Sequence, residues 1–440
     1  MARAQDFAII NATIATGDGS EPVENGTLVV RGGNVVAAGV GVAVPLGVEA
    51  IDAGGAWVTP GLFATVTTLG IWDVGAVSQS NDIRANDSPF SAALDVSPIV
   101  NPANQHILIH RAAGITRAAT TTMPSGSIFA GQGAIIDLDS DGQPVMRARA
   151  FQMVDLGETG GRIAGGSRAS AHALLRNALR EAGSYGEAAR IPGRSSEARP
   201  TRSGDDLPID PRLSGRESER GGDVLLTRFD AAALVPVVRG EQPLYVAVER
   251  ASDIRAVLAL NEEFPALDLV LVGAGEGWLV AQEIAAARVP VIADALDDLP
   301  ETFEVLAATQ SNIGRLVQAG VQVAISASSG ENPRNMPQAA GNLVALSRLP
   351  GATGLSWGQA FAAISSVPAA ISGYEGRAGI LAPGALADVV MWSGDPLEMG
   401  SVPTRVFIGG IEQSLENHQT RLRTRYRDLD ESDQPKGFDW

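Results

Sequence analysis

The stretch Trp57-Val58-Thr59-Pro60-Gly61 divides the sequence into two different patterns. On its N-terminal side, short apolar runs such as Phe7-Ala8-Ile9-Ile10-Asn11 alternate with Gly, Asp and Asn turn signals, which is typical of β-strands. On its C-terminal side, apolar runs are separated by segments with helical periodicity, up to about residue 380. Strands that are buried on both faces and followed by helices are typical of parallel βα units. We therefore predict a β domain over residues 1–58 and an α/β domain after it.

The α/β domain has the repeat expected of a barrel. Its predicted strands lie at 62–68, 115–120, 245–249, 269–272, 290–293 and 321–326, and a long helical stretch at 303–319 precedes the last of them. Roughly eight strand–helix units fit within this region, and a (β/α)8 barrel usually takes about 250 residues or more. We therefore predict a TIM barrel over residues 59–379.

Two insertions are predicted to interrupt the barrel. The first, at about 123–160, contains Asp141-Gly142 between apolar runs, which is a hairpin signal. The second, at 189–222, is rich in Pro, Arg, Ser and Gly, so it has little apolar surface to bury and is expected to be an irregular, mobile loop. A lid over the barrel mouth is the functional alternative for this loop, since long loops often carry function.

The C-terminal part returns to a β pattern. Apolar runs at 387–392 and 404–408 are followed by a Gly409-Gly410 turn, and we predict that residues 380–413 complete a small β-sandwich with residues 1–58. Residues 414–440 form a polar tail with one expected helix around 421–427.

Composition excludes several classes of function. Among 440 residues, 50 acidic residues outnumber 33 basic ones and give a formal charge of −17, which argues against nucleic acid or an anionic membrane as the partner. The absence of cysteine excludes thiolate metal sites, disulfides and Cys nucleophiles. No apolar run is long enough to cross a bilayer, and the N-terminus has no signal-peptide pattern. We expect a cytoplasmic protein if Met1 is the native start, and a periplasmic one if a signal was trimmed.

Four separated motifs resemble one family. The run from Ile51-Asp52-Ala53-Gly54-Gly55 to Pro60-Gly61-Leu62 resembles the amidohydrolase superfamily, near its imidazolonepropionase-like and prolidase-like members. Residues 384–396 resemble the closing signature of the same family, and residues 312–321 and 367–374 resemble its late barrel units. The resemblance implies a (β/α)8 TIM barrel with a small β-sandwich made by the N- and C-terminal segments.

The resemblance also implies a metal site that the sequence does not fill. Members of the family hold zinc or another divalent metal at the C-terminal mouth of the barrel, where the metal activates water. The family's His-x-His pair falls on Val66 and Thr68, its fifth- and sixth-strand His near Ala247 and Gly273, and its final Asp on Ser328. We call these five residues the vacated positions. None is a His or a carboxylate, no convincing bridging Lys or Glu is found, and we predict no cofactor.

The four histidines do not offer a replacement. His106 and His110 are four residues apart and can share a helical face as a zinc pair. However, no Glu lies between them, and the resemblance places their helix outside the barrel. His172 in a helix and His418 in the polar tail are expected to face solvent.

Other polar residues near predicted strand ends remain as weak catalytic candidates. They are Thr68, Glu249, Arg250, Glu276, Asp294 and Ser328. Carboxylates can act as acid and base where burial or like charge shifts their pKa values. Ordinary ion pairs at the barrel rim are the simpler interpretation, because such pairs also gather there.

Two functional hypotheses follow. By descent the protein belongs with hydrolases of C–N bonds, but the loss of the ligands indicates a degenerate member. Such a member would bind a small amide or peptide-like ligand, or act as a homo-oligomer or in complex with an active paralogue. The competing hypothesis is an active amide hydrolase with a rebuilt, carboxylate-based site. Fold alone cannot decide between them, because function depends on the site.

Overall fold

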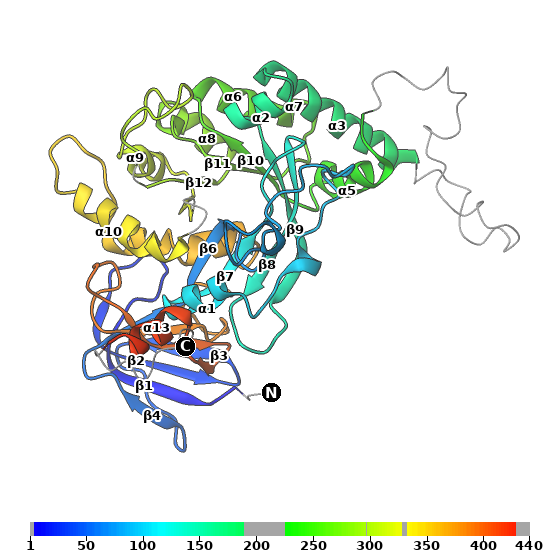
Figure 1. The fold of residues 1–440 in the computed structure, drawn as a ribbon. Coiled ribbons are helices and arrows are strands. Elements are labelled where there is room, and N and C mark those ends of the chain that lie inside the picture. The colour runs from blue at the N-terminus through cyan, green and yellow to red at the C-terminus, as the bar shows by residue number, and fades with distance from the viewer. Residues whose placement is uncertain (1–3, 189–224, 296, 328–331, 428–440) are drawn as a thin grey trace, which may run out of the picture.

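The computed structural model describes residues 4–188, 225–295, 297–327 and 332–427. These residues form two sheets, a barrel and a separate sheet built from both ends of the chain (Figure 1). The predicted combination of barrel and composite β domain is therefore confirmed. The predicted loop at 189–222 lies outside the described residues, as does the vacated position Ser328.

The composite sheet joins strands that lie more than 300 residues apart. Its strands are β1 (Phe7–Ile14), β2 (Val23–Arg31), β3 (Asn34–Gly39), β4 (Glu49–Asp52), β5 (Trp57–Pro60), β14 (Val389–Trp392), β15 (Pro403–Ile408) and β16 (Ile411–Gln413). The order is β16-β15-β14-β5-β1-β2-β3, with β4 paired to β1. The antiparallel pairing of β14 with β5 connects the two chain ends. Phe7 and Phe407 stack at 4.6 Å between ring centroids, so both ends also contribute to its apolar core.

The barrel consists of eight paired strands and is nearly closed. They are β6 (Leu62–Thr67), β7 (Ile115–Thr120), β8 (Phe129–Asp137), β9 (Val145–Asp155), β10 (Leu244–Val248), β11 (Leu269–Gly273), β12 (Val291–Ala293) and β13 (Val323–Ile325), paired in that order. The first and last strands both bond to a short segment after α11 (Trp357–Ala362). The amide of Phe63 donates to Ile364 O at 3.1 Å and that of Ile325 to Ala363 O at 2.9 Å.

The hairpin around Asp141-Gly142 is present, but its placement as an insertion at about 123–160 is wrong. Strands β8 and β9 pair antiparallel, and both are part of the barrel wall. Strand β8 runs antiparallel to β7 and to β9, so the barrel departs here from a purely parallel pattern. The reason is burial: β8 is covered on both faces from Phe129 to Ile136, as a strand inside a barrel wall must be.

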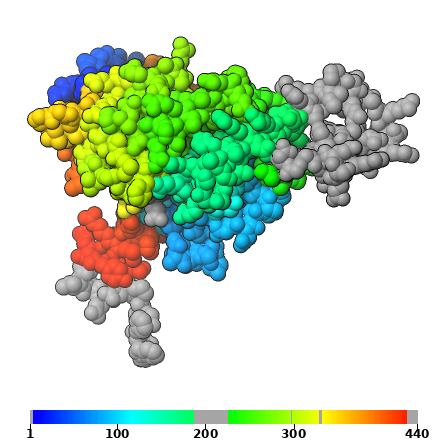
Figure 2. All heavy atoms as spheres, turned by 90° about the horizontal axis from the view of Figure 1, so that it is seen from above, coloured from blue at the N-terminus to red at the C-terminus, as the bar shows by residue number. Residues whose placement is uncertain are grey.

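Helices cover the outside of the barrel (Figure 1). Besides α11, the described helices are α1 (Gln105–Ala112), α2 (Glu158–Ile163), α3 (Arg168–Ala188), α5 (Arg228–Val238), α6 (Ala251–Leu258), α7 (Leu260–Glu263), α8 (Ala281–Ala287), α9 (Asn312–Gln318), α10 (Met336–Leu346), α12 (Ser366–Ile371) and, beside the composite sheet, α13 (His418–Arg425). Short 3-10 turns occur at η1 (Ser78–Ser80), η2 (Ser97–Ile99), η4 (Gly277–Val280) and η5 (Pro333–Asn335). Helix α13, the helix expected in the polar tail, has no buried residue and lies at the edge of the molecule (Figure 2). None of the described helices is long and apolar enough to span a membrane.

The long helix predicted over 303–319 is shorter in the structure, because α9 begins only at Asn312. Both backbone groups of Ala307 bond to side chains instead. Its amide donates to Glu276 Oε1 at 3.1 Å, and its carbonyl accepts from Trp278 Nε1 at 2.8 Å. These bonds hold residues before Asn312 as a loop across the ends of the strands.

Candidate functional site: the barrel mouth

The vacated positions within the described residues lie at or beside the C-terminal ends of barrel strands. Val66 and Thr68 are at and just after the end of β6, Ala247 is the second-last residue of β10, and Gly273 ends β11. The C-terminal ends of parallel strands meet at one rim of a barrel, which is where active sites of this architecture are built. We call this rim the mouth.

Two of these side chains belong to the apolar filling of the barrel. Val66 and Ala247 pack against the cluster of inward-facing residues that includes Phe63 and Tyr245. Tyr245 stacks on Phe151 with 4.3 Å between the ring centroids. The positions that correspond to ligands in the family therefore extend the hydrophobic core up to the mouth.

Thr68 contributes a hydroxyl, but that group has a structural contact. The side chain is buried, and its Oγ1 accepts a hydrogen bond from Trp72 Nε1 at 2.9 Å. This bond fixes the indole of Trp72, whose ring lies 3.9 Å from that of His106. A neutral hydroxyl is in any case a poor zinc donor beside the imidazole, thiolate and carboxylate ligands of typical sites.

The backbone at two of the strand ends adopts the left-handed region. Val66 has φ of 52° and Ala274, next to Gly273, has φ of 50°. A β-branched residue in this region is a genuine outlier, and such strain costs about 1–3 kcal/mol and clusters at functional sites. Val66 therefore has the kind of strained backbone that clusters at functional sites, but its side chain has no atom that could bind a metal.

Gly273 leaves space that another side chain fills. Its φ is +90°, and a Cβ built there would lie 1.9 Å from Glu249 Oε1. The Glu249 carboxyl therefore occupies the volume that a sixth-strand ligand would need. Any side chain at 273 requires Glu249 to move.

Glu249 is the candidate whose electrostatics are most altered. Its Oε2 accepts a hydrogen bond from the Gly275 amide at 2.7 Å. Burial raises the pKa of Glu249 to about 8. The hydrogen bond from the Gly275 amide opposes this rise, and the negative charges of Asp294 and Glu304 add to it. The side chain is therefore mostly a neutral acid at pH 7.

Glu276 and Arg250 are structural anchors. Glu276 is 8% exposed, and its Oε2 accepts from the amide of Ala251, the first residue of α6, at 3.1 Å. Its other oxygen accepts from Ala307, so both oxygens are engaged. Arg250 donates from Nη2 to Phe303 O at 2.6 Å. A carboxylate at a helix N-terminus is stabilising, which accounts for Glu276 without catalysis.

Sequence reasoning missed two further carboxylates at the mouth. Asp155 Oδ1 accepts from the amides of Gly157 and Gly160, both at 2.9 Å, and Glu304 Oε2 accepts from Glu158 N at 2.8 Å. Both thus serve the N-terminus of α2, and burial raises the pKa of each. The position of Asp155 directly after a buried strand was the available signal, whereas the fold alone brings Glu304 to α2.

Asp294 is the candidate that lines a cavity. It follows β12 and lines a cavity of about 300 Å³ together with Asp297 and Ser326, among others. Asp297 and Ser326 were not among the sequence candidates. The run Asp297-Asp298 was visible in the sequence, but nothing in it indicated a cavity.

The described residues do not fit the metal of the family. Among them, no group of three or more His, Cys, Asp or Glu side chains could hold a metal ion. The rings of His106 and His110 lie 6.3 Å apart and contact backbone carbonyls, with His106 Nε2 at 3.1 Å from Asp73 O and His110 Nδ1 at 2.6 Å from His106 O. Burial lowers the pKa of His110 to about 4.

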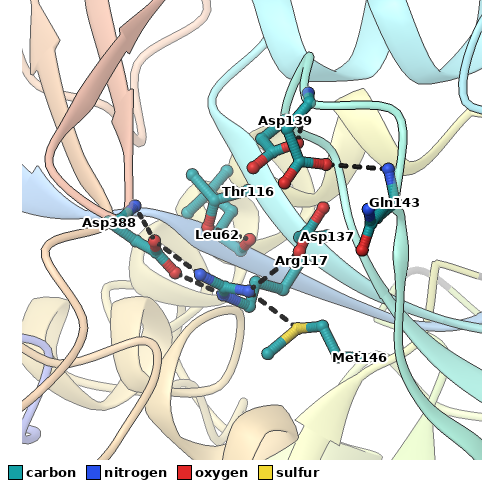
Figure 3. Close-up of polar contacts among 10 residues, drawn as sticks. Leu62, Thr116, Arg117, Asp137, Asp139, Gln143, Met146 and Asp388 are labelled. Atoms are coloured by element: carbon teal, nitrogen blue, oxygen red, sulfur yellow. Dashed lines mark hydrogen bonds and ion pairs between the residues drawn. The ribbon is translucent and has the colours of Figure 1, made fainter. Parts of the chain in front are cut away.

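A different polar cluster lies at the other end of the barrel, which we call the base. Arg117 near the start of β7 donates to both carboxylate oxygens of Asp388, at 2.6 and 2.9 Å, and lies 3.5 Å from Asp137 (Figure 3). Asp388 also accepts from the amide of Gly409 at 2.9 Å. Asp388 belongs to the closing stretch 384–396, so this part of the signature fastens the composite sheet to the barrel.

Comparison with known proteins agrees with this architecture. The family model described as "Amidohydrolase family" matches residues 312–402. An amidohydrolase structure from Thermotoga maritima has 22% identity and a TM-score of 0.75, covering 92% of this chain and 99% of its own. A prolidase solved with N-methylphosphonate-L-proline has 14% identity and a TM-score of 0.53, with coverage of 93% and 99%. Molinate hydrolase has 14% identity and a TM-score of 0.53, with coverage of 94% and 96%. No curated protein matches the sequence.

The barrel and the split sheet have the fold of the amidohydrolase structure from Thermotoga maritima, and residues 312–402 match the amidohydrolase family model.

Proposed function

We propose that this chain is a superfamily member that has lost metal-dependent hydrolysis and binds a small amide or peptide-like ligand at the mouth. One observation carries the proposal. At three strand ends where the resemblance expects metal ligands stand Val66, Ala247 and Gly273, and the Glu249 carboxyl fills the space beside Gly273. Within the superfamily, the motif at residues 51–62 supports placement near the imidazolonepropionase-like and prolidase-like members.

The chemistry of the donor set supports the loss. A tight zinc site takes three or four N, O or S ligands at about 2.0–2.3 Å, and Val, Ala and Gly side chains supply none. Three mouth carboxylates, Asp155, Glu276 and Glu304, accept bonds from amides at helix starts. Their recruitment to a metal would leave those amides unsatisfied, at about 1–3 kcal/mol for each buried group.

A chain that keeps the barrel and the composite sheet but lacks the metal ligands could also act as a subunit beside an active partner. Assembly as a homo-oligomer or with an active paralogue is part of the same proposal. Its test is the molar mass of the purified chain in solution, alone and mixed with a paralogue that hydrolyses amides. A mass that stays monomeric in both samples would remove the partner role and leave the ligand-binding role.

The hydrolase assay tests the proposal directly. The purified protein is incubated with a panel of N-acyl amino acids, dipeptides and cyclic amides, with and without added zinc or manganese. We expect no turnover above buffer in any sample. Metal-stimulated turnover that a chelator abolishes would sink the proposal.

A second candidate function rests on Glu249. A carboxyl with a pKa of about 8, near the charges of Asp294 and Asp297, resembles the pairs of carboxyls with separated pKa values that carry out acid–base catalysis. Under this alternative the protein is an amide hydrolase with a rebuilt site, and Glu249 is its general acid. Metal-independent turnover that Glu249→Gln abolishes, with the fold intact, would favour this alternative.

A further inference from the structure

The cavity beside Asp294 lies between the ends of two barrel strands and helix α10. Asp294 follows β12, Ser326 follows β13, and Asn335 and Gln338 come from η5 and the first turn of α10. Its volume of about 300 Å³ is at the lower end of the range for small-molecule sites. The cavity therefore suits a small ligand of about amino-acid size.

Negative charge dominates this cavity. Asp294 and Asp297 are among its described lining residues, and no Lys or Arg is. Burial raises the pKa of Asp297 to about 6, and the charges of Asp294, Glu301 and Asp298 add to this effect. A positively charged ligand would relieve this repulsion.

Two arginines, Arg250 and Arg334, bond to groups that do not line the cavity. Arg250 donates to Phe303 O, and Arg334 of η5 donates to Gln419 Oε1 at 3.1 Å. The chain has a single lysine, Lys436, which lies outside the described residues. The described part of the chain thus has a concave acidic surface whose lining includes no cationic side chain.

A second, independent feature indicates a ligand here. Ser326 lines the cavity and is 9% exposed, and its hydroxyl has no hydrogen-bond partner among the described residues. A buried polar group without a partner costs about 1–3 kcal/mol and requires an explanation. A donor group on a ligand in the cavity would satisfy it.

The remaining lining limits the kind of cation. Met336, Ala327 and Ala339 provide apolar contact, and Asn335 and Gln338 provide amides. No group of three carboxylate or imidazole side chains suited to a metal ion occurs among the described residues. An organic cation with an apolar side chain and an amide matches these groups better than a bare metal ion.

We propose that this cavity binds the protonated amino group of a small peptide-like amide, with Asp294 and Asp297 facing the ammonium and Ser326 accepting one of its hydrogen bonds. The inference rests on the proposed function, because it names the ligand class of the same mouth. The apolar part of the ligand lies against Met336, and its amide lies near Asn335 and Gln338.

Calorimetric titration of the full-length protein with three probes tests this proposal. Norleucinamide carries an ammonium, a butyl group and an amide, N-acetylnorleucinamide lacks the charge, and norleucine adds a carboxylate. We expect norleucinamide to bind at least about tenfold more tightly than either of the others, a factor that equals about 1.4 kcal/mol. Equal affinity for the charged and the acetylated probe, or no binding of norleucinamide, would overturn the proposal.

Two matched variants locate the binding. Asp297→Asn removes the charge that lines the cavity, and Asp298→Asn removes the neighbouring charge on the same exposed segment. We expect Asp297→Asn to weaken norleucinamide binding about tenfold or more, Ser326→Ala to weaken it a fewfold, and Asp298→Asn to leave it within about twofold. Equal losses in Asp297→Asn and Asp298→Asn would contradict a defined site and indicate diffuse attraction.

An ammonia-release assay on the same samples separates this inference from the proposed function. Binding of norleucinamide without ammonia release supports both. Ammonia release would overturn the loss of hydrolysis, while the preference for the charged probe would still support the cationic site. Absence of both binding and release overturns the cationic site alone.

Discussion

The two ends of the barrel differ in the surroundings of their polar side chains. At the base, the Arg117 guanidinium pairs with Asp388 through two hydrogen bonds, and both side chains are buried. At the mouth, the vacated positions Val66 and Ala247 are apolar. Glu249 lies in the space beside Gly273, where its carboxyl accepts a hydrogen bond from the Gly275 amide. The difference shows that the buried charges of the base join the composite sheet to the barrel, whereas apolar side chains occupy two of the strand ends at the mouth.

The resemblance to the family also differs between the base and the mouth. The closing stretch around Asp388 resembles the family because that aspartate fastens the composite sheet to β7. The strand ends at the mouth do not carry the family's ligand motif, and Val66 and Ala247 pack there against the apolar cluster inside the barrel. A motif match can therefore report a fold without specifying an activity.

Breaking the pair at the base should have the largest effect. Asp388→Asn leaves the buried Arg117 charge with only its longer contact to Asp137, and removal of one member of a buried pair typically costs about 3–5 kcal/mol. We expect a loss of that order in the free energy of unfolding, measured by urea denaturation. The matched control is Arg405→Gln, which breaks the exposed Arg405–Glu412 pair and should cost less than about 1 kcal/mol. Similar losses of unfolding free energy in both variants would show that the Arg117–Asp388 pair stabilises the fold no more than an exposed ion pair does.

A side chain at the sixth-strand position should have the next largest effect. Gly273→Ala places a Cβ against Glu249 Oε1 at a residue with φ of +90°, so we expect destabilisation of about 1–3 kcal/mol. In a Glu249→Ala background the clash is absent and only the backbone strain at residue 273 remains. Gly273→Ala should therefore lower the free energy of unfolding by less in that background. A double-mutant cycle measures this coupling. Additive effects would show that Glu249 does not fill the space of residue 273.

The pH dependence of stability sharpens the description of Glu249. Its pKa is about 8 in the fold against an ordinary value of 4.5, so the folded state retains a proton that the unfolded state has lost. Stability from this group therefore falls as pH rises from about 4.5 to 8. Glu249→Gln removes that loss and should be more stable than the parent at pH 8.5. The upper limit of the difference is about 5 kcal/mol, since the pKa shift from 4.5 to about 8 converts at about 1.4 kcal/mol per unit.

The control for that experiment is the same pair of proteins at pH 4.5, where both carry a neutral side chain and their difference in unfolding free energy should shrink. A difference that does not change between the two pH values would show that the Glu249 carboxyl titrates as in water.

Much of the fold could be predicted from sequence, because apolar periodicity and turn residues are local signals. Residues 58–62 separated the two domains, and the strands at 387–392 and 404–408 indicated the return to the composite sheet. Strand β8 was misplaced because a hairpin signal specifies the turn but not the sheet that the hairpin joins. The helix over 303–319 was overextended because the side chains of Glu276 and Trp278, distant in sequence, bond to Ala307.

The mouth could be predicted in part. The resemblance located Val66, Ala247 and Gly273 at strand ends, where the structure has them. It could not show that Glu276 serves the start of α6, that Glu304 reaches α2, or that Arg117 pairs with Asp388 across 271 positions. These contacts join segments far apart in the sequence, so only the folded chain brings them together.

The most direct test of the central claim is the zinc content of the full-length protein. The protein is dialysed against micromolar zinc, passed through a chelating resin and measured by elemental analysis, with His106→Ala as a control for the histidine pair on α1. We predict far less than one zinc per chain after the resin, and no amide hydrolysis. One zinc per chain that survives in both the parent and His106→Ala, together with chelator-sensitive amide hydrolysis, would contradict the account.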